Sequence, residues 1–199
     1  VGQQHLRRSP ARLRTETMKT AAIASIMAGL AVMGLAACNR EPAPAPVEAK
    51  AEAWVGKDVV LYLPDPVMKA RVDVAALSPY VNAATRAAEG AVRAAPAQPG
   101  ASGMLLLMVK PGERAKAWVV TGEPAPSAET VAAVVKAVEA VPAPAVREGP
   151  ILVGVGFDAW GGGAPPAGAS PPIPRDWYGY FSKNGGRLDD AFMARVWPD

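Results

Sequence analysis

The sequence has little histidine or cysteine, and this shortage excludes several classes of catalytic site. Its only histidine is His5 and its only cysteine is Cys38, both near the start of the 199 residues. The rest of the chain therefore cannot form a Ser-His-Asp or Cys-His nucleophile pair, a histidine-ligated zinc site or a disulfide. We expect no catalytic residue, no cofactor and no metal site, and thus a protein that is not an enzyme.

The chain also lacks an excess of charge once its first segment is set aside. Residues 1–37 contain five basic residues and one acidic residue, which leaves 16 Lys and Arg against 17 Asp and Glu in the remainder. The sequence pI of about 9.1 therefore reflects the first segment. A body without a basic surplus is a poor partner for a polyanion, so we expect no binding to nucleic acid.

Residues 18–37 have the order of a secretory signal peptide. Lys19 follows Met18, an uncharged apolar run extends to position 35, and two small residues come next. A basic start, an apolar middle and a small-residue cleavage region are typical of such signals. We expect translation to start at Met18, so that residues 1–17 are an overextension of the reading frame. The alternative is a genuine basic extension.

The sequence Leu-Ala-Ala-Cys at 35–38 resembles the lipobox of bacterial lipoproteins. The resemblance implies cleavage between Ala37 and Cys38, a diacylglycerol on the Cys38 thiol and acylation of the new amino group. Two or more acyl chains anchor a protein stably, at about 0.8 kcal/mol per buried CH₂. Because Asn39 follows in place of Asp, the resemblance favours the outer membrane, with the protein facing the periplasm. The alternative is a chance cysteine in an uncleaved membrane anchor.

Proline-rich stretches divide the remaining chain. Residues 38–53 are rich in proline and alanine and are typical of a semi-rigid tether. We expect an α+β domain over 54–160, a Gly/Pro linker over 161–174 and an aromatic segment over 175–199. Burial of so many aromatic side chains is favourable, so this last segment is predicted to dock on its own domain or on a partner. Docking on the domain is favoured because an exposed aromatic patch promotes aggregation.

The hydrophobic pattern predicts a small antiparallel sheet with one or two packed helices. Strands are expected over 58–64, over 149–157 and as a hairpin over 103–120, with its turn at Pro111-Gly112. A helix is predicted over 73–92. Pro79 is expected to break this helix, with Ser78 as the N-cap of the second piece.

A second helix is predicted over 127–141, and it is the clearest one in the sequence. Ser127 is a suitable N-cap, and Glu129 lies in the first turn, where a negative charge is favourable. One apolar stripe at helical spacing is formed by Val131, Val134, Val135, Val138 and Val141. The stripe predicts that this helix packs against the sheet.

The order of elements over 78–157 resembles the C-terminal domain of TonB and TolA. The likeness is carried by the hairpin MLLLMVKPGERAKAWVV, the helix SAETVAAVVKAVEA, the proline-containing connection VPAPAVREGP and the last strand ILVGVGF. It implies a TonB C-terminal-like α+β domain. The aromatic end of the family's helix is replaced here by VEAVPAP, and a lipid takes the place of its transmembrane helix.

Few residues remain that could carry chemistry. Asp189 and Asp190 are adjacent, so on a helix they diverge by about 100° and do not meet at one substrate. Asp65 and Asp73 lie in turn-like contexts. The glycines of GVGFDAWGGG at 154–163 are not followed by a helix, as a phosphate-binding loop requires. Sugar stacking is a further option for the five tryptophans, which are Trp54, Trp118, Trp160, Trp177 and Trp197.

These observations predict a lipid-anchored protein of the cell envelope with a non-enzymatic binding or structural role. Its expected partners are the membrane, through lipid on Cys38, and an envelope protein or the cell wall, which it could bind through a free sheet edge. The alternative is an envelope hydrolase that acts on cell-wall glycan with carboxylates only, as glycosidases do.

Overall fold

The computed structural model of the protein describes residues 51–199, so Ala37, Cys38 and most of the tether lie outside the described range. The elements in chain order are β1 (Trp54–Leu61), α1 (Asp65–Arg71), α2 (Val74–Ala94), β2 (Ala101–Lys110), β3 (Arg114–Thr121), α3 (Ala128–Glu139), β4 (Ile151–Ala159), the 3₁₀ helix η1 (Arg175–Trp177), α4 (Tyr178–Lys183) and α5 (Asp190–Val196). The predicted α+β class with an antiparallel sheet is confirmed.

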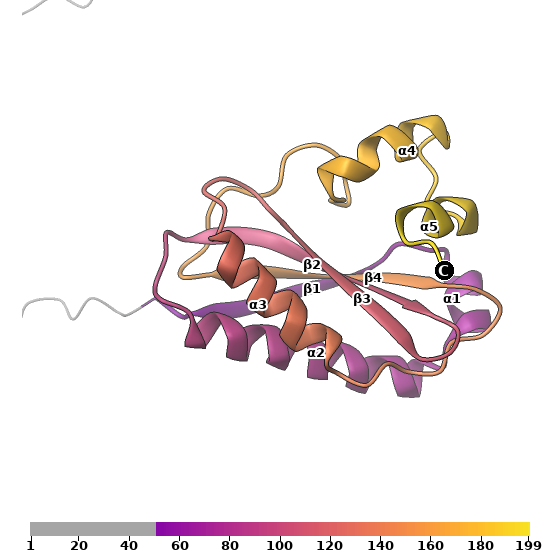
Figure 1. Cartoon of the computed structure of the whole chain (residues 1–199), viewed down its shortest axis with the longest axis horizontal. Helices are drawn as coiled ribbons and strands as arrows, with labels where there is room; N and C mark the ends of the chain where they lie inside the picture. Colours follow the sequence, from indigo (N-terminus) through magenta and orange to yellow (C-terminus); the bar gives the residue numbers. More distant parts are fainter. Residues whose placement is uncertain (1–50) are drawn as a thin grey trace, which may run out of the picture. The chain divides into compact units, whose positions relative to one another are not determined.

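The four strands form one antiparallel sheet in the order β1-β4-β2-β3. Almost every residue of the two central strands, β2 and β4, is buried, which requires cover on both faces of the sheet. The helices α2 and α3 lie along one face, and the segment with α4 and α5 lies on the other (Figure 1). The described domain therefore has three layers.

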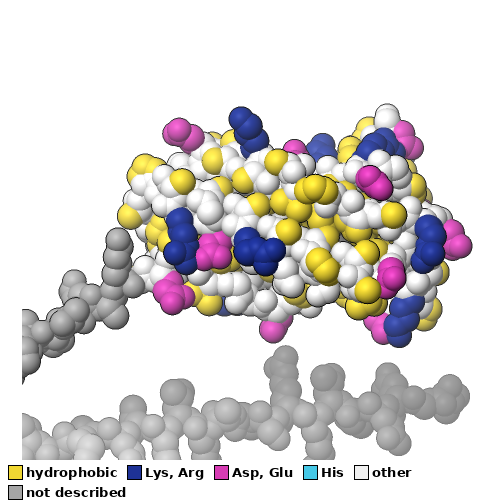
Figure 2. All heavy atoms as spheres, turned by 90° about the horizontal axis from the view of Figure 1, so that it is seen from below, with side chains coloured by type: hydrophobic (Ala, Val, Ile, Leu, Met, Phe, Trp, Pro, Cys, Tyr) yellow, Lys and Arg dark blue, Asp and Glu magenta, His cyan; other side chains and the backbone are white. Residues whose placement is uncertain are grey.

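The helical layer is built from small and β-branched side chains. Ala84 and Ala88 of α2 are buried, as are Val134 and Val138 of α3. Small residues allow the two helices to pack closely against each other and the sheet. On the outer face of this layer, apolar side chains gather in the central part and most charged side chains lie toward the margins (Figure 2).

The predicted break of the first helix at Pro79 is wrong, because α2 continues through it. The helix begins after Asp73, whose side chain accepts a hydrogen bond from the Ala75 amide, and Ser78 caps nothing. Pro79 is exposed and lies in the second turn. The carbonyl that loses its partner to proline therefore faces solvent, where water can satisfy it.

Two further expectations near the start of the domain need correction. The first strand covers 54–61 and not 58–64, and the residues after it form α1, whereas the sequence placed Asp65 in a turn-like context. Asp65 stands in the first turn of α1 between two prolines, and proline is well tolerated there because the first amides of a helix have no partner within it.

The glycines Gly154 and Gly156 lie inside β4, not in a phosphate loop.

The aromatic C-terminal segment docks on the sheet face opposite the helices. Trp177 is almost fully buried and makes edge-to-face contacts with Trp118 of β3 and Phe192 of α5. The buried Lys110 ammonium donates to the Trp197 carbonyl oxygen and to the Asp199 carboxylate. This arrangement agrees with docking on the chain's own domain, the alternative that the sequence favoured.

Candidate functional site

The strand β3 ends the sheet, and its outer edge is the candidate site. The strand pairs with β2 along its whole length and with no other strand in the described part of the chain. An edge strand presents a row of backbone amides and carbonyls that can pair with another chain. The question is which of these groups remain available.

The register of β3 identifies its outward-facing residues. The Gly122 amide donates to the Ser102 carbonyl oxygen at 3.1 Å, so even-numbered residues turn their backbone groups toward β2. The Ala117 amide instead donates to the Glu139 carboxylate of α3 at 3.0 Å. Backbone groups alternate along an antiparallel strand, so Val119 and Thr121 also face outward. Their amides make no hydrogen bond to any residue within 51–199.

The outer edge of β3 forms the floor of a groove with apolar walls. Val131 and Val135 of α3, both half-buried, stand on one side of it. Pro165 and Tyr178 of the C-terminal layer stand on the other side. The groove encloses about 590 Å³. The valine stripe predicted from the sequence is therefore divided, with Val134 and Val138 in the core and these two valines at the groove.

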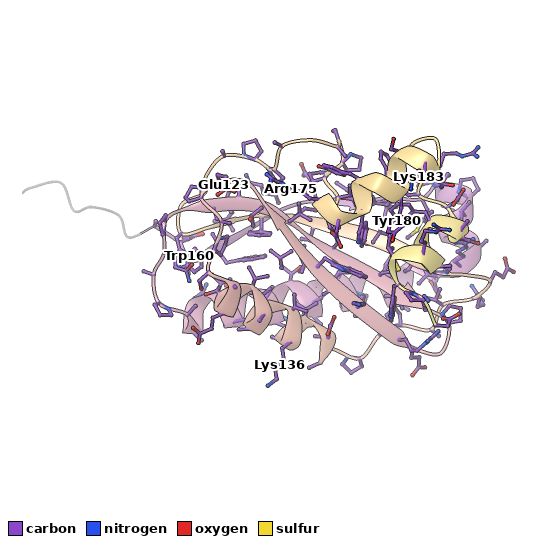
Figure 3. All side chains as sticks on the ribbon, turned by 45° about the horizontal axis from the view of Figure 1, so that its top comes forward. Glu123, Lys136, Trp160, Arg175, Tyr180 and Lys183 are labelled. Carbon is purple, nitrogen blue, oxygen red and sulfur yellow. The ribbon has the colours of Figure 1, made fainter. Side chains whose placement is uncertain are left out.

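Charged groups lie at the ends of this groove. Glu123 and Arg175 occupy the rim near the end of β3, and both stand on the same side of the domain in Figure 3, whereas Lys136 points away from the sheet. Near the start of β3, the Lys116 ammonium lies 5.3 Å from the centre of the Trp118 ring. The middle of the groove is thus apolar, with charge of both signs at its margins.

A larger hollow of about 660 Å³ lies between α1 and the start of α5. Arg71 forms one wall, and its guanidinium makes two hydrogen bonds to the Asp190 carboxylate and one to the Pro150 carbonyl oxygen. Most of its other lining residues are apolar, including Leu63 and Leu188. The charged groups of Arg71, Asp189 and Asp190 in this hollow are already paired, and only the exposed Arg187 adds a further charged side chain, so the hollow offers less to a ligand than the unpaired backbone of β3.

A polar cluster closes the opposite end of the sheet. Asp158 of β4 accepts hydrogen bonds from the Lys57 ammonium at 2.7 Å and from the Ser102 hydroxyl. The same hydroxyl accepts from the Gly163 amide at 2.9 Å. The bond from Lys57, and then that from Ser102, hold the pKa of Asp158 below its ordinary value. Every member has a partner, so the cluster joins three strands and the linker and leaves no free nucleophile.

The carboxylates considered from the sequence have structural contacts. Asp189 caps α5 by accepting from the Phe192 amide, and these contacts lower its pKa. Asp190 pairs with Arg71, and Asp73 caps α2. Asp65 lies 3.5 Å from the Lys69 ammonium. No group of three or more His, Cys, Asp or Glu residues suited to a metal occurs within 51–199.

Two of the five tryptophans are buried and cannot stack on a sugar. Trp54 stacks on Phe157 with ring centres 4.3 Å apart, and Trp177 fills the C-terminal layer. Trp118 is half-buried in the groove.

No helix in the part of the chain that the structure describes is long and apolar enough to cross a membrane. Cys38 and Ala37, the predicted lipidation and cleavage residues, lie outside the described residues.

The sequence predicts the hairpin but not which of its two strands lies at the edge of the sheet. Strand order depends on the pairing of β4 with β2, which are far apart in the sequence. One signal was present. The half-exposed Val131 and Val135 add an apolar side to a helix whose core contacts are made by Val134 and Val138. An apolar stripe that is wider than the core contact needs indicates that the helix has a second apolar surface outside the core.

Comparison with known proteins found no match: no protein family, no curated protein and no solved structure is significantly similar to this chain. The resemblance to the TonB and TolA domain is therefore not confirmed.

Proposed function

We propose that the protein is a lipid-anchored, non-enzymatic binding protein of the cell envelope. Its ligand in this proposal is an extended segment of an envelope protein, which adds as a fifth strand along β3. The observation that carries the proposal is the floor of the groove, where the outward amides of Val119 and Thr121 lie between apolar walls. In strand addition, such backbone groups supply affinity and the flanking pockets select side chains.

The walls of the groove favour a lone segment over a second copy of this chain. Val135 and Pro165 belong to the layers on either side of β3, and both line the groove. A second copy would bring its own α3 and its own C-terminal layer to the same place, and these would meet the walls. A single extended segment carries no flanking layers.

The position of the tether is compatible with such a role. The tether precedes β1, and β1 and β3 are the two outer strands of the sheet. Neighbouring strands lie about 4.8 Å apart, so the binding edge is roughly 14 Å from the strand that follows the tether. A lipid on Cys38 would therefore leave the β3 edge open to partners.

Val119→Pro provides a direct test of the binding edge. Proline at this position removes an outward amide and places a ring on the edge, while the pairing of β3 with β2 is kept. Random peptides displayed on phage are selected against the full chain purified in detergent. We expect extended apolar peptides to be enriched on the wild type and lost on the variant. Equal enrichment on both proteins would contradict strand addition.

The anchor is tested separately with Cys38→Ser. We expect the variant to lose labelling by a fatty-acid probe and to release the domain into the soluble fraction. A variant that stays in the membrane with its leader uncut would show that residues 20–37 form a helical anchor instead.

A further inference from the structure

The outward amide of Ala117 already has a partner within the domain. Glu139, the last residue of α3, reaches across to β3 and accepts this hydrogen bond with its Oε1 atom at 3.0 Å. In strand addition, a carbonyl of the incoming segment takes this place. The segment must therefore displace the carboxylate of Glu139 before it can pair with the first half of β3.

Glu139 and Tyr80 lie on α3 and α2, two helices that pack against each other, and the Tyr80 hydroxyl is the group to which Glu139 could turn. Tyr80 of α2 is only 5% exposed, and its hydroxyl makes no hydrogen bond to any of the described residues. A buried polar group without a partner destabilises the folded state. Burial, and then the nearby negative charge of Glu139, raise the pKa of Tyr80 to about 12. The hydroxyl therefore keeps its proton at neutral pH and can donate it.

We propose that Glu139 is a two-position latch on the binding edge. In the free protein its carboxylate accepts from the Ala117 amide. When a segment adds to β3, a backbone carbonyl of the segment takes over the Ala117 amide, and Glu139 turns to accept from the Tyr80 hydroxyl. This inference rests on the proposed strand addition and assigns two residues that govern it.

The count of hydrogen bonds explains why the latch selects its ligand. In the closed position Ala117 is paired and Tyr80 is not. With a segment bound and the latch open, both groups are paired. If Glu139 turns away and no carbonyl replaces its carboxylate, the Ala117 amide is left without a hydrogen-bond acceptor. An apolar molecule that fills the groove without offering a carbonyl therefore gains nothing from the latch, whereas an extended peptide does.

The closed position is tested without any ligand, by amide hydrogen exchange measured with NMR on the full chain. Glu139→Ala is expected to accelerate exchange of the Ala117 amide by about tenfold or more, because its acceptor is lost. Glu129→Ala is the matched control, since Glu129 lies in the first turn of the same helix. This control should leave the exchange rate of the Ala117 amide unchanged. Unchanged exchange of Ala117 in Glu139→Ala would overturn the latch.

The open position is tested with a peptide selected on the wild-type protein. Tyr80→Phe is expected to weaken peptide binding about tenfold, because Glu139 then gains no new partner on opening. Glu139→Ala should bind within about threefold of the wild type, since one bond is lost in each state. Adding Tyr80→Phe to Glu139→Ala should have no further effect.

The outcomes separate this inference from the function on which it rests. If Tyr80→Phe weakens peptide binding both in the wild type and in Glu139→Ala, Tyr80 acts through packing. If Tyr80→Phe does not change peptide binding, Glu139 blocks the edge but does not turn to Tyr80. Either result overturns the latch while strand addition stands. Failure to select any peptide contradicts the proposed function, and the exchange of Ala117 still decides whether the closed contact is made.

Discussion

The two outer strands of the sheet, β1 and β3, meet solvent in different ways. β3 keeps one register over its length, so its outward groups form a continuous row. In β1 the register shifts between Gly56 and Val59. Before this shift the Trp160 amide donates to the Ala53 carbonyl oxygen, and after it the Tyr62 amide donates to the Leu152 carbonyl oxygen. The backbone groups of β1 that face β4 therefore belong to odd-numbered residues before the shift and to even-numbered residues after it.

This difference indicates which edge can accept another strand. Bulges and charged residues are common ways in which proteins protect an edge from pairing, and β1 has both, with Lys57 and Asp58 at the shift. Its exposed apolar residues, Val55, Val59 and Leu61, are therefore not backed by a continuous row of backbone groups. β3 has no bulge, and its two charged residues, Arg114 and Lys116, lie in its first half, whereas its second half lies between apolar walls.

The largest expected effect comes from removing one wall of the β3 groove. Truncation after Gly163 deletes the layer that contains Trp177, Phe192 and Met193, all nearly fully buried. We expect the melting temperature to fall by about 10 °C or more and dye binding to increase, because the sheet face becomes exposed. An unchanged melting temperature would show that this layer contributes nothing to the fold.

The other wall is tested through its buried side. Val134 of α3 is 4% exposed, so Val134→Asp buries an unpaired charge and should destabilise the protein by about 3 kcal/mol or more in urea unfolding. Lys136→Ala, on the exposed face of the same helix, should change stability by less than about 0.5 kcal/mol. Similar effects at the two positions would contradict the packing of α3 on the sheet.

The two sides of β3 itself are compared by moving one proline. Val120→Pro removes an amide that faces β2 and should cost about 3 kcal/mol or more of stability. Val119→Pro removes an outward amide and should stay within about 1 kcal/mol of the wild type. The comparison is made by thermal unfolding. Reversed magnitudes would place the outward row on the even-numbered residues and contradict the register on which the site depends.

The smallest effect is expected at the protected edge, where Lys57 pairs with Asp158. The folded protein holds the pKa of Asp158 below the ordinary value of 3.8, so ionised Asp158 stabilises the fold above that pH. This contribution is lost as the pH falls through the lowered pKa. We expect Asp158→Asn to flatten the pH dependence of stability below about pH 4, by about 0.5 kcal/mol because Lys57 is half exposed. An identical pH profile in the variant would rule out this role.

Local patterns predicted much of the fold. The hairpin around Pro111-Gly112 was predicted because a turn dipeptide separates two apolar runs, and Gly112 does adopt the positive φ that a type II turn needs. The α3 helix was predicted because Ser127 caps a regular valine stripe. Docking of the last segment followed from its aromatic content, since such residues gain much from burial.

What could not be predicted depends on contacts between distant residues. The continuity of α2 through Pro79 depends on that residue facing solvent, which packing decides. The position of β3 at the edge follows from the strand order, and the contact of Glu139 with Ala117 requires α3 to lie beside β3. Neither relation leaves a local pattern in the sequence.

The central claim is that β3, and not β1, accepts an extended segment. It is tested most directly by NMR of the labelled chain with a selected peptide bound. The account predicts cross-strand contacts between the peptide and the Val119 and Thr121 amides, and slower exchange of both. Contacts confined to Val59 and Leu61 of β1, or to the hollow beside Arg71, would contradict it.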